Sequence, residues 1–194
     1  LRGALWSEDT QVMVAALQTL GFRVNVESDP HESSNRTISL EGLAGRIPNA
    51  GTSAQPLDLF VGNAGTAARF LAALVSLGTG AYRIHGTSRM HERPQAGLFQ
   101  ALRQLGYKVI SENDDNRLPA RIVGASSQPG VTRDCSVSIE SSSQFASALL
   151  LCAKAGRWNV KVVGENADES PYVRMTSELI QVFPQQRQSF QIEP

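Results

Sequence analysis

The sequence has few cysteines and no excess of either charge, and each shortage excludes a class of protein. Only Cys135 and Cys152 occur among 194 residues, and both lie in apolar stretches without the spacing of a metal site or a disulfide framework. We therefore expect reduced, buried cysteines and a reducing compartment. Basic and acidic residues number 18 each, so the bulk charge indicates neither a nucleic-acid nor a membrane partner, although a local basic pocket is compatible with neutrality.

Long hydrophobic runs are also missing. No stretch reaches the roughly 18 apolar residues of a membrane span, and the opening LRGALWSEDT has neither the charged region nor the apolar region of a signal peptide. The opening also lacks Met, so we expect the chain to begin partway into a longer protein. The expected location is the cytoplasm, with a plastid left open because the N-terminus looks truncated.

What is present is the alternation of helix and strand patterns. Residues 7–21 predict a helix, with acidic residues in the first turn, apolar residues inside and Gly21 at the end. Alternating apolar and polar residues predict strands over 22–27 and 36–42. A second helix, Leu-Gly stop and strand follow over 97–112. At 41% hydrophobic and 19% charged residues, the chain can bury a real core.

An internal repeat organises these elements. Residues 57–86 and 136–164 share one layout: a strand, a turn of small polar residues, an Ala/Leu-rich helix, a glycine and a second strand. The repeating unit has the order βαβαββ, which predicts an α/β (α+β) fold. We expect one incomplete domain over 1–194, with a partial unit over 1–56, a complete unit over 57–130 and a nearly complete unit over 131–194. The last unit should contain a helix over 171–183 and a strand over 188–194.

Both small-residue turns stand where a helix should begin. The turns are Gly62 to Thr66 in the first copy and Ser141 to Gln144 in the second. A helix N-terminus offers unpaired N–H groups and the positive end of the helix dipole, which together suit an anion. The alternative is that Ser142, Ser143 and Thr66 only cap their helices, which is the commoner use of such residues.

Four ordered stretches carry a resemblance to a known family. They are GNAGTAARFLAAL (62–74), GTSRMHERPQAGLFQALRQLG (86–106), SSSQFASALLL (141–151) and SPYVRMT (170–176). Together they closely resemble the 5-enolpyruvylshikimate-3-phosphate synthase family, and the resemblance covers nearly the whole chain. It implies two similar domains of three βαβαββ units each, with helices inside and sheets outside. It also implies transfer of the enolpyruvyl group of phosphoenolpyruvate to the 5-hydroxyl of shikimate 3-phosphate, in the shikimate pathway of aromatic amino acid biosynthesis, without a cofactor or a metal.

The resemblance assigns roles position by position. Four residues are implied to bind shikimate 3-phosphate: Ser142, Ser143, Gln144 and Tyr172. Four are implied to bind phosphoenolpyruvate: Asn63, Gly65, Arg89 and again Gln144, which reaches between the substrates. No catalytic residue is expected in this chain, because the lysine, aspartate, glutamate and histidine of the family's proton-transfer groups should lie outside it. We therefore expect the isolated chain to be inactive, and to associate with the missing part of the enzyme or with itself.

Some positions depart from the family pattern, and the roles of some others are undecided from the sequence. Phe70 stands where many members have proline. Glu169 stands where many have a serine that contacts phosphate, and the negative charge of a carboxylate would oppose that contact. For Arg69, His91 and Arg93, a packing or salt-bridge role competes with ligand contact. His31 and His85 are interpreted as residues without a ligand role.

Two other functions remain open at this point. The related carboxyvinyltransferase that acts on UDP-N-acetylglucosamine shares the fold, but it carries a reactive cysteine in a loop unlike SRMHERPQAG (88–97), and neither Cys135 nor Cys152 is placed for that role. A non-catalytic binding module on the same fold is the second alternative.

Overall fold

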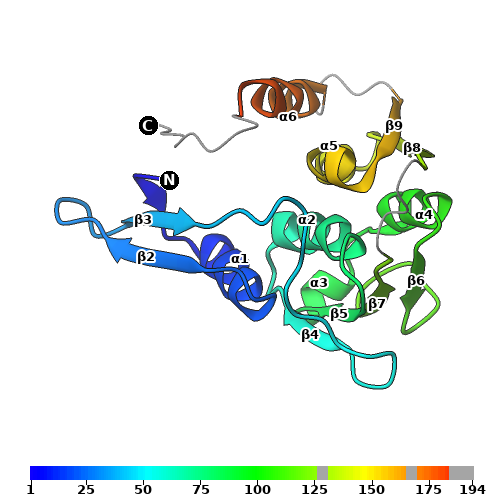
Figure 1. Ribbon diagram of the computed structural model, residues 1–194, viewed down its shortest axis with the longest axis horizontal. Coiled ribbons are helices and arrows are strands. Elements are labelled where there is room, and N and C mark those ends of the chain that lie inside the picture. The colour runs from blue at the N-terminus through cyan, green and yellow to red at the C-terminus, as the bar shows by residue number, and fades with distance from the viewer. Residues whose placement is uncertain (126–130, 165–169, 184–194) are drawn as a thin grey trace.

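The computed structural model describes residues 1–125, 131–164 and 170–183 (Figure 1). The predicted strand at 188–194 and Glu169 lie outside these residues. The described elements fall into three groups, each built around its own small sheet.

The middle group contains the complete unit. Its strands are β4 (Leu57–Phe60), β5 (Ala81–His85), β6 (Lys108–Ser111) and β7 (Ala120–Val123), and its helices are α2 (Gly65–Ser76), α3 (Ser88–His91) and α4 (Ala96–Gln104). The sheet order is β4-β5-β7-β6, with β4 and β5 parallel and the other pairs antiparallel. The predicted βαβαββ order is confirmed, and the one-turn helix α3 is an addition that the sequence pattern did not predict.

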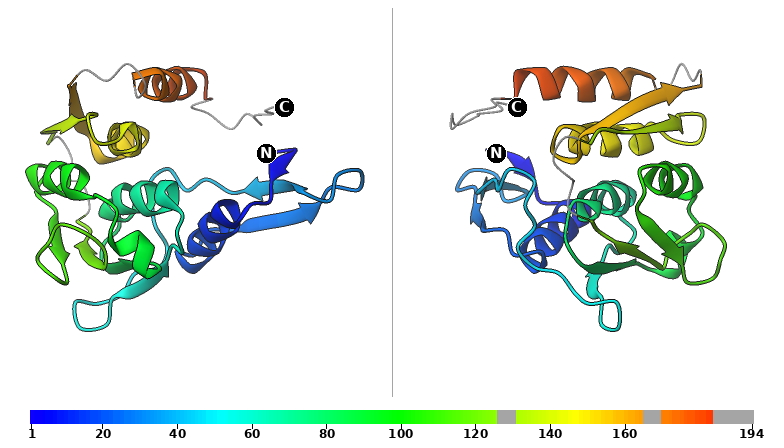
Figure 2. Two further views of the ribbon diagram at one scale, coloured as in Figure 1. Left: turned by 180° about the vertical axis from the view of Figure 1, so that it is seen from behind. Right: turned by 45° about the vertical axis from the view of Figure 1, so that its right-hand side comes forward.

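The last group repeats the first half of this unit. Strand β8 (Arg133–Ser138), helix α5 (Ser143–Gly156) and strand β9 (Trp158–Val163) form a parallel β-α-β element, which helix α6 (Ser170–Val182) follows. The predicted helix at 171–183 is therefore confirmed. In Figure 2, α6 lies over α5, and the hydroxyl groups of Ser147 and Thr176 are 2.8 Å apart across this contact.

The first group is the later part of a unit. Helix α1 (Glu8–Thr19) precedes the hairpin of β2 (Val24–Ser28) and β3 (Asn35–Leu40), as the periodicity predicted. The sequence missed β1 (Ala4–Leu5), which pairs with β3, because two residues are too short to show a period. The order β1-β3-β2 matches β5-β7-β6, so β1 takes the place that β5 has in the middle group.

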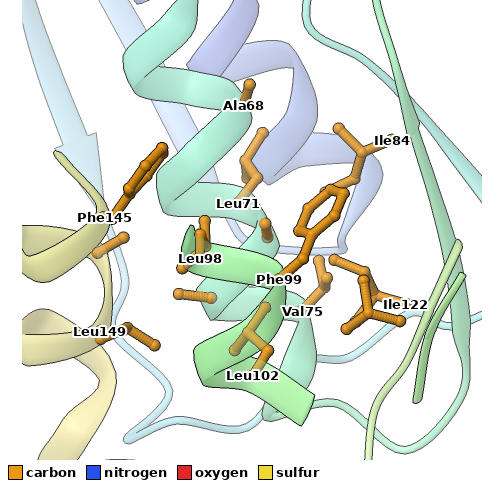
Figure 3. Packing of buried hydrophobic residues seen from close by; sticks show 14 of the residues in the cluster. Ala68, Leu71, Val75, Ile84, Leu98, Phe99, Leu102, Ile122, Phe145 and Leu149 are labelled. Atoms are coloured by element: carbon orange, nitrogen blue, oxygen red, sulfur yellow. The ribbon is translucent and has the colours of Figure 1, made fainter. Parts of the chain in front are cut away.

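The helices lie inside and the sheets outside, as the resemblance implied. Figure 3 shows side chains of α2, α4 and α5 meeting in one cluster, with Phe145 and Leu149 of α5 on one side and Ile84 and Ile122 of the sheet on the other. Small side chains such as Ala68 and Ala72 line α2, so neighbouring helices can approach it closely. This packing holds the two helix N-termini in a fixed relation.

Two aromatic residues of this core pair their buried polar groups with each other. The indole N–H of Trp158 donates a hydrogen bond to the hydroxyl of Tyr107 (3.1 Å), whose ring meets the indole edge-on. Cys135 and Cys152 are buried and unbonded, as expected, and burial raises the pKa of their thiols to about 11 and about 12. Among the described residues, no helix is long and apolar enough to cross a bilayer.

An ion-pair network covers the outer face of the middle sheet. Arg83 donates to both oxygens of Glu112 (2.8 and 3.1 Å) and to Asp58 (3.0 Å), and Arg121 adds a third bond to Glu112 (3.2 Å). The Arg83 guanidinium holds the pKa of the Glu112 carboxyl below its usual value. His85 pairs with Asp58 at 2.6 Å on the same face, in keeping with its interpretation as a structural residue.

Candidate functional site

The first small-residue turn joins β4 to α2. Gly62 adopts φ +54°, and its carbonyl accepts a hydrogen bond from the backbone N–H of Thr87 at 2.9 Å, which fixes α3 beside the turn. Helix α2 has Ala64 at its N-cap, and an alanine has no side-chain oxygen to cap the first turn. Thr66 lies inside that turn and is not the cap. The helix continues regularly through Phe70, so the departure from proline there leaves α2 intact.

The second turn joins β8 to α5. Ser142 is the N-cap, and its Oγ accepts a hydrogen bond from the backbone N–H of Gln144 at 3.2 Å. The Ser142 side chain therefore caps α5, and a ligand-binding role for the same hydroxyl stays a prediction. Ser143 is only 3% exposed, so little of its side chain is accessible to a ligand at the surface.

The structure brings the two turns together through their side chains. The Nε2 group of Gln144 donates a hydrogen bond to Oγ1 of Thr66 at 3.0 Å, although the two residues are far apart in sequence. On the other side of the same amide, Nη1 of Arg69 donates to Oε1 of Gln144 at 2.6 Å. The N-termini of α2 and α5, with their partial positive charges, thus lie side by side.

Arg93 covers the first turn. Its Nη1 donates a hydrogen bond to the backbone oxygen of Asn63 at 3.1 Å. A Cβ added to Gly65 would lie 2.5 Å from Nη2 of Arg93, so the absence of a side chain at Gly65 leaves room for the guanidinium. Asn63 itself is exposed and Gly65 is buried. The structure shows Arg93 packed on the turn, and its contact with a ligand stays a prediction.

Arg89 and Tyr172 take no part in these hydrogen bonds. Arg89 is 76% exposed and donates to Glu92, the C-cap of α3, at 2.9 Å. Tyr172 is 56% exposed on α6, one turn before Thr176, whose hydroxyl contacts α5. The structure therefore groups Gln144 with Asn63 and Gly65 through Thr66 and Arg93. Arg89 and Tyr172 are exposed and stay outside this set of contacts.

The remaining motif residues have structural contacts. Nε2 of His91 accepts a hydrogen bond from the backbone N–H of Gly86 at 3.2 Å, which closes the loop that leads into α3. A Cβ on Gly86 would lie 2.3 Å from the carbonyl oxygen of Gly62, so only glycine allows this close approach. His31 is exposed in the loop between β2 and β3.

The chain is similar to a group of known proteins over almost all of its length. The family model described as EPSP synthase (3-phosphoshikimate 1-carboxyvinyltransferase) matches residues 1–189. The chain belongs to the EPSP synthase family. The 3-phosphoshikimate 1-carboxyvinyltransferase of Laribacter hongkongensis is 39% identical over 184 residues, and that of Vibrio cholerae is 39% identical over 186 residues.

The same comparisons define how much of the family's length the chain represents. Each of these two alignments covers 94% of this chain and 40% of the relative, so the chain spans about 40% of the length of these curated EPSP synthases. The solved structure of EPSP synthase from Acinetobacter baumannii superposes with a TM-score of 0.62 at 22% identity, over 92% of this chain and 36% of that one. This likeness supports the fold alone. None of these relatives is named as a UDP-N-acetylglucosamine enzyme, so that alternative is not favoured.

Sequence reasoning missed three features of the site. It did not find the contact between Thr66 and Gln144, the role of Arg69 beneath Gln144, or the position of Arg93 over Gly65. The internal repeat was the available signal for the first feature, because it aligned the two turns. The neighbouring positions of Arg89 and Arg93 in one motif gave no means of deciding which of them meets the turn.

Proposed function

We propose that the chain is the substrate-binding part of a 3-phosphoshikimate 1-carboxyvinyltransferase. In the complete protein, the 5-hydroxyl oxygen of shikimate 3-phosphate would form a bond to C2 of phosphoenolpyruvate, and the bond between C2 and the phosphate oxygen would break. Inorganic phosphate would leave and would take up the proton that the hydroxyl loses. The two buried, unbonded cysteines fit a reducing compartment, and we propose the cytoplasm.

One observation carries this proposal: the Gln144–Thr66 hydrogen bond, which joins the N-terminal turns of α5 and α2. Each turn suits one anion, and the contact places the two turns close enough for two anionic substrates to lie side by side. The proposed residues for shikimate 3-phosphate are Ser142, Ser143, Gln144 and Tyr172. Those for phosphoenolpyruvate are Asn63, Gly65, Arg89 and Gln144.

Arg89 requires a rearrangement to take its proposed role. Its guanidinium has to leave Glu92 to reach a carboxylate or phosphate at the first turn. Both side chains are more than half exposed, and exposed ion pairs contribute only about 0–1 kcal/mol, so a dianionic ligand can compete with Glu92. Arg93 already lies over the turn and adds a second guanidinium there.

The isolated chain should bind without turnover. General acid–base catalysis needs a positioned proton donor or acceptor within hydrogen-bond reach of the reacting atoms. The resemblance assigns those groups to segments outside these 194 residues. We expect no phosphate release from phosphoenolpyruvate by the chain alone in the presence of shikimate 3-phosphate.

The experiment is calorimetric titration of the chain with shikimate 3-phosphate and with shikimate. The phosphate ester should bind at least tenfold more tightly, and Ser143→Ala should weaken its binding by about 1.5–3 kcal/mol if a hydrogen bond to a charged ligand is lost. Ser136→Ala, at an exposed position of β8, is the matched control and should leave the affinity unchanged. Equal affinity for the ester and for shikimate would contradict the proposed function.

A further inference from the structure

Arg69 is a buried cation beneath the junction of the two turns. It is 4% exposed, and its guanidinium lies 5.3 Å from the centre of the Phe145 ring. Nη1 donates to Oε1 of Gln144 at 2.6 Å, and Nη2 donates to the carbonyl of Pro94 at 3.3 Å. These contacts hold the guanidinium in place and leave one edge directed at the Gln144 amide.

A guanidinium can only donate hydrogen bonds, and this property fixes the orientation of the amide. The Gln144 atom that faces Arg69 has to be the oxygen, because an NH₂ group at 2.6 Å would set donor against donor. The NH₂ group is therefore turned toward Thr66. Without Arg69, the two ends of the amide could exchange.

The orientation of the amide also sets the polarity of Thr66. Because Oγ1 of Thr66 accepts from Gln144, its own proton remains available for donation. In the part of the chain that the structure describes, neither this hydroxyl proton nor the second N–H of the Gln144 amide has an acceptor. Both side chains are half-buried, so a ligand at the junction can reach them.

We propose that Arg69 is a positioning residue, which fixes the Gln144–Thr66 pair so that it presents two hydrogen-bond donors to an anion held between the turns. A flipped amide would present an oxygen instead and would consume the Thr66 proton. The inference rests on the proposed function for the identity of the anion, shikimate 3-phosphate or phosphoenolpyruvate. The polarity of the pair follows from the contacts of Arg69 alone.

Affinity for shikimate 3-phosphate provides the first test. Arg69→Met should lower the affinity about tenfold, and Arg69→Lys, which keeps a cationic donor, should restore part of it. Arg121→Met, on the outer face of the sheet, is the matched control and should leave the affinity unchanged. A tenfold loss in Arg69→Met that Arg69→Lys recovers supports the proposal, and affinity in Arg69→Met equal to wild type overturns it.

Gln144→Glu separates positioning from a merely structural role, and it remains informative if Arg69→Met does not fold. A carboxylate keeps the contact with Arg69 and makes it an ion pair, so the thermal midpoint should not fall. It removes the NH₂ donor, so affinity for shikimate 3-phosphate should fall tenfold or more. Wild-type affinity in a folded Gln144→Glu protein would overturn the proposal.

Nuclear magnetic resonance of the unliganded chain gives a readout that needs no substrate. The side-chain NH₂ signals of Gln144 can be assigned by their loss in Gln144→Glu. Their chemical shifts should differ from those of mobile glutamines in the wild type and should become equal to them in Arg69→Met. Chemical shifts equal to those of mobile glutamines in the wild type would refute a fixed amide. If the wild type shows fixed signals but does not prefer the ester to shikimate, the proposed function fails while the positioning by Arg69 stands.

Discussion

Replacing Gly65 with alanine should reveal an energetic coupling with Arg93. The new Cβ would lie 2.5 Å from Nη2 and 2.6 Å from Nη1 and Cζ of Arg93. To reach an ordinary contact distance, the guanidinium must retreat by about 0.9 Å, which stretches its 3.1 Å bond to the carbonyl of Asn63 beyond hydrogen-bond range. The lost bond should cost about 0.5–1.5 kcal/mol.

The same substitution also has a favourable effect on α2. Gly65 is the first helical residue and its φ is not positive, so alanine fits the backbone and gains up to about 1 kcal/mol in helix propensity. In the wild-type background, gain and loss nearly cancel. In an Arg93→Ala background only the gain remains, so Gly65→Ala should stabilise the chain there by about 0.5–1 kcal/mol.

The assay is a double-mutant cycle on Gly65→Ala and Arg93→Ala, measured by urea unfolding followed by circular dichroism. We expect a coupling free energy of about 0.5–1.5 kcal/mol, which corresponds to roughly 1–6 °C in the thermal midpoint of a chain of this size. Gly42→Ala, where an added Cβ meets nothing within 4 Å, is the control and should be additive with Arg93→Ala. Additivity of Gly65→Ala with Arg93→Ala to within about 0.3 kcal/mol would refute the reasoning.

Three further outcomes follow from buried and paired groups. Cys135 and Cys152 should not react with a thiol reagent at pH 8 until the chain is unfolded, because burial raises their pKa values to about 11 and about 12; rapid labelling of the native chain would contradict this. Because the pKa of Glu112 is lowered by Arg83, its contribution to stability is present above the unfolded value of about 4.3 and is lost at lower pH. Between about pH 5 and pH 3 the wild type should therefore lose more unfolding free energy than Glu112→Gln, and equal losses would argue against the pair. Tyr107→Phe should cost about 1–3 kcal/mol in urea unfolding, since it leaves a buried indole N–H without its acceptor, and a neutral result would show that another group replaces the hydroxyl.

The elements of the fold were predictable where a period and an end signal coincide. Helix α1 has acidic residues at its start and Gly21 at its end, and the hairpin that follows alternates apolar and polar residues over several positions. The predicted and observed bounds differ by one or two residues, as helix and strand ends usually do. Strand β1 and helix α3 are too short to show a period, so they depend on contacts with neighbouring segments of the folded chain.

The two turns of the candidate site were predictable from the sequence, but the contact between them was not. The repeat showed that Gly62 to Thr66 and Ser141 to Gln144 are equivalent turns, and the family motifs assigned them to two substrates. That Gln144 reaches Thr66 depends on how α2 packs against α5, which sequence periodicity does not specify. The placement of Arg93 rather than Arg89 over the first turn likewise depends on the backbone bond that fixes α3 to Gly62.

The packing of α2 and α6 also predicts where the molecule opens. Nine of the twelve residues of α2 are buried, whereas α6 has thirteen residues and a single buried one, Thr176. Amide hydrogens of α2 should therefore exchange with solvent only through global unfolding, while those of α6 should exchange through a local opening of much lower free energy. The first turn thus begins a helix that should exchange slowly, and Tyr172 lies on a helix that should open readily. A ligand that engages both should leave exchange in α2 almost unchanged and slow it markedly in α6.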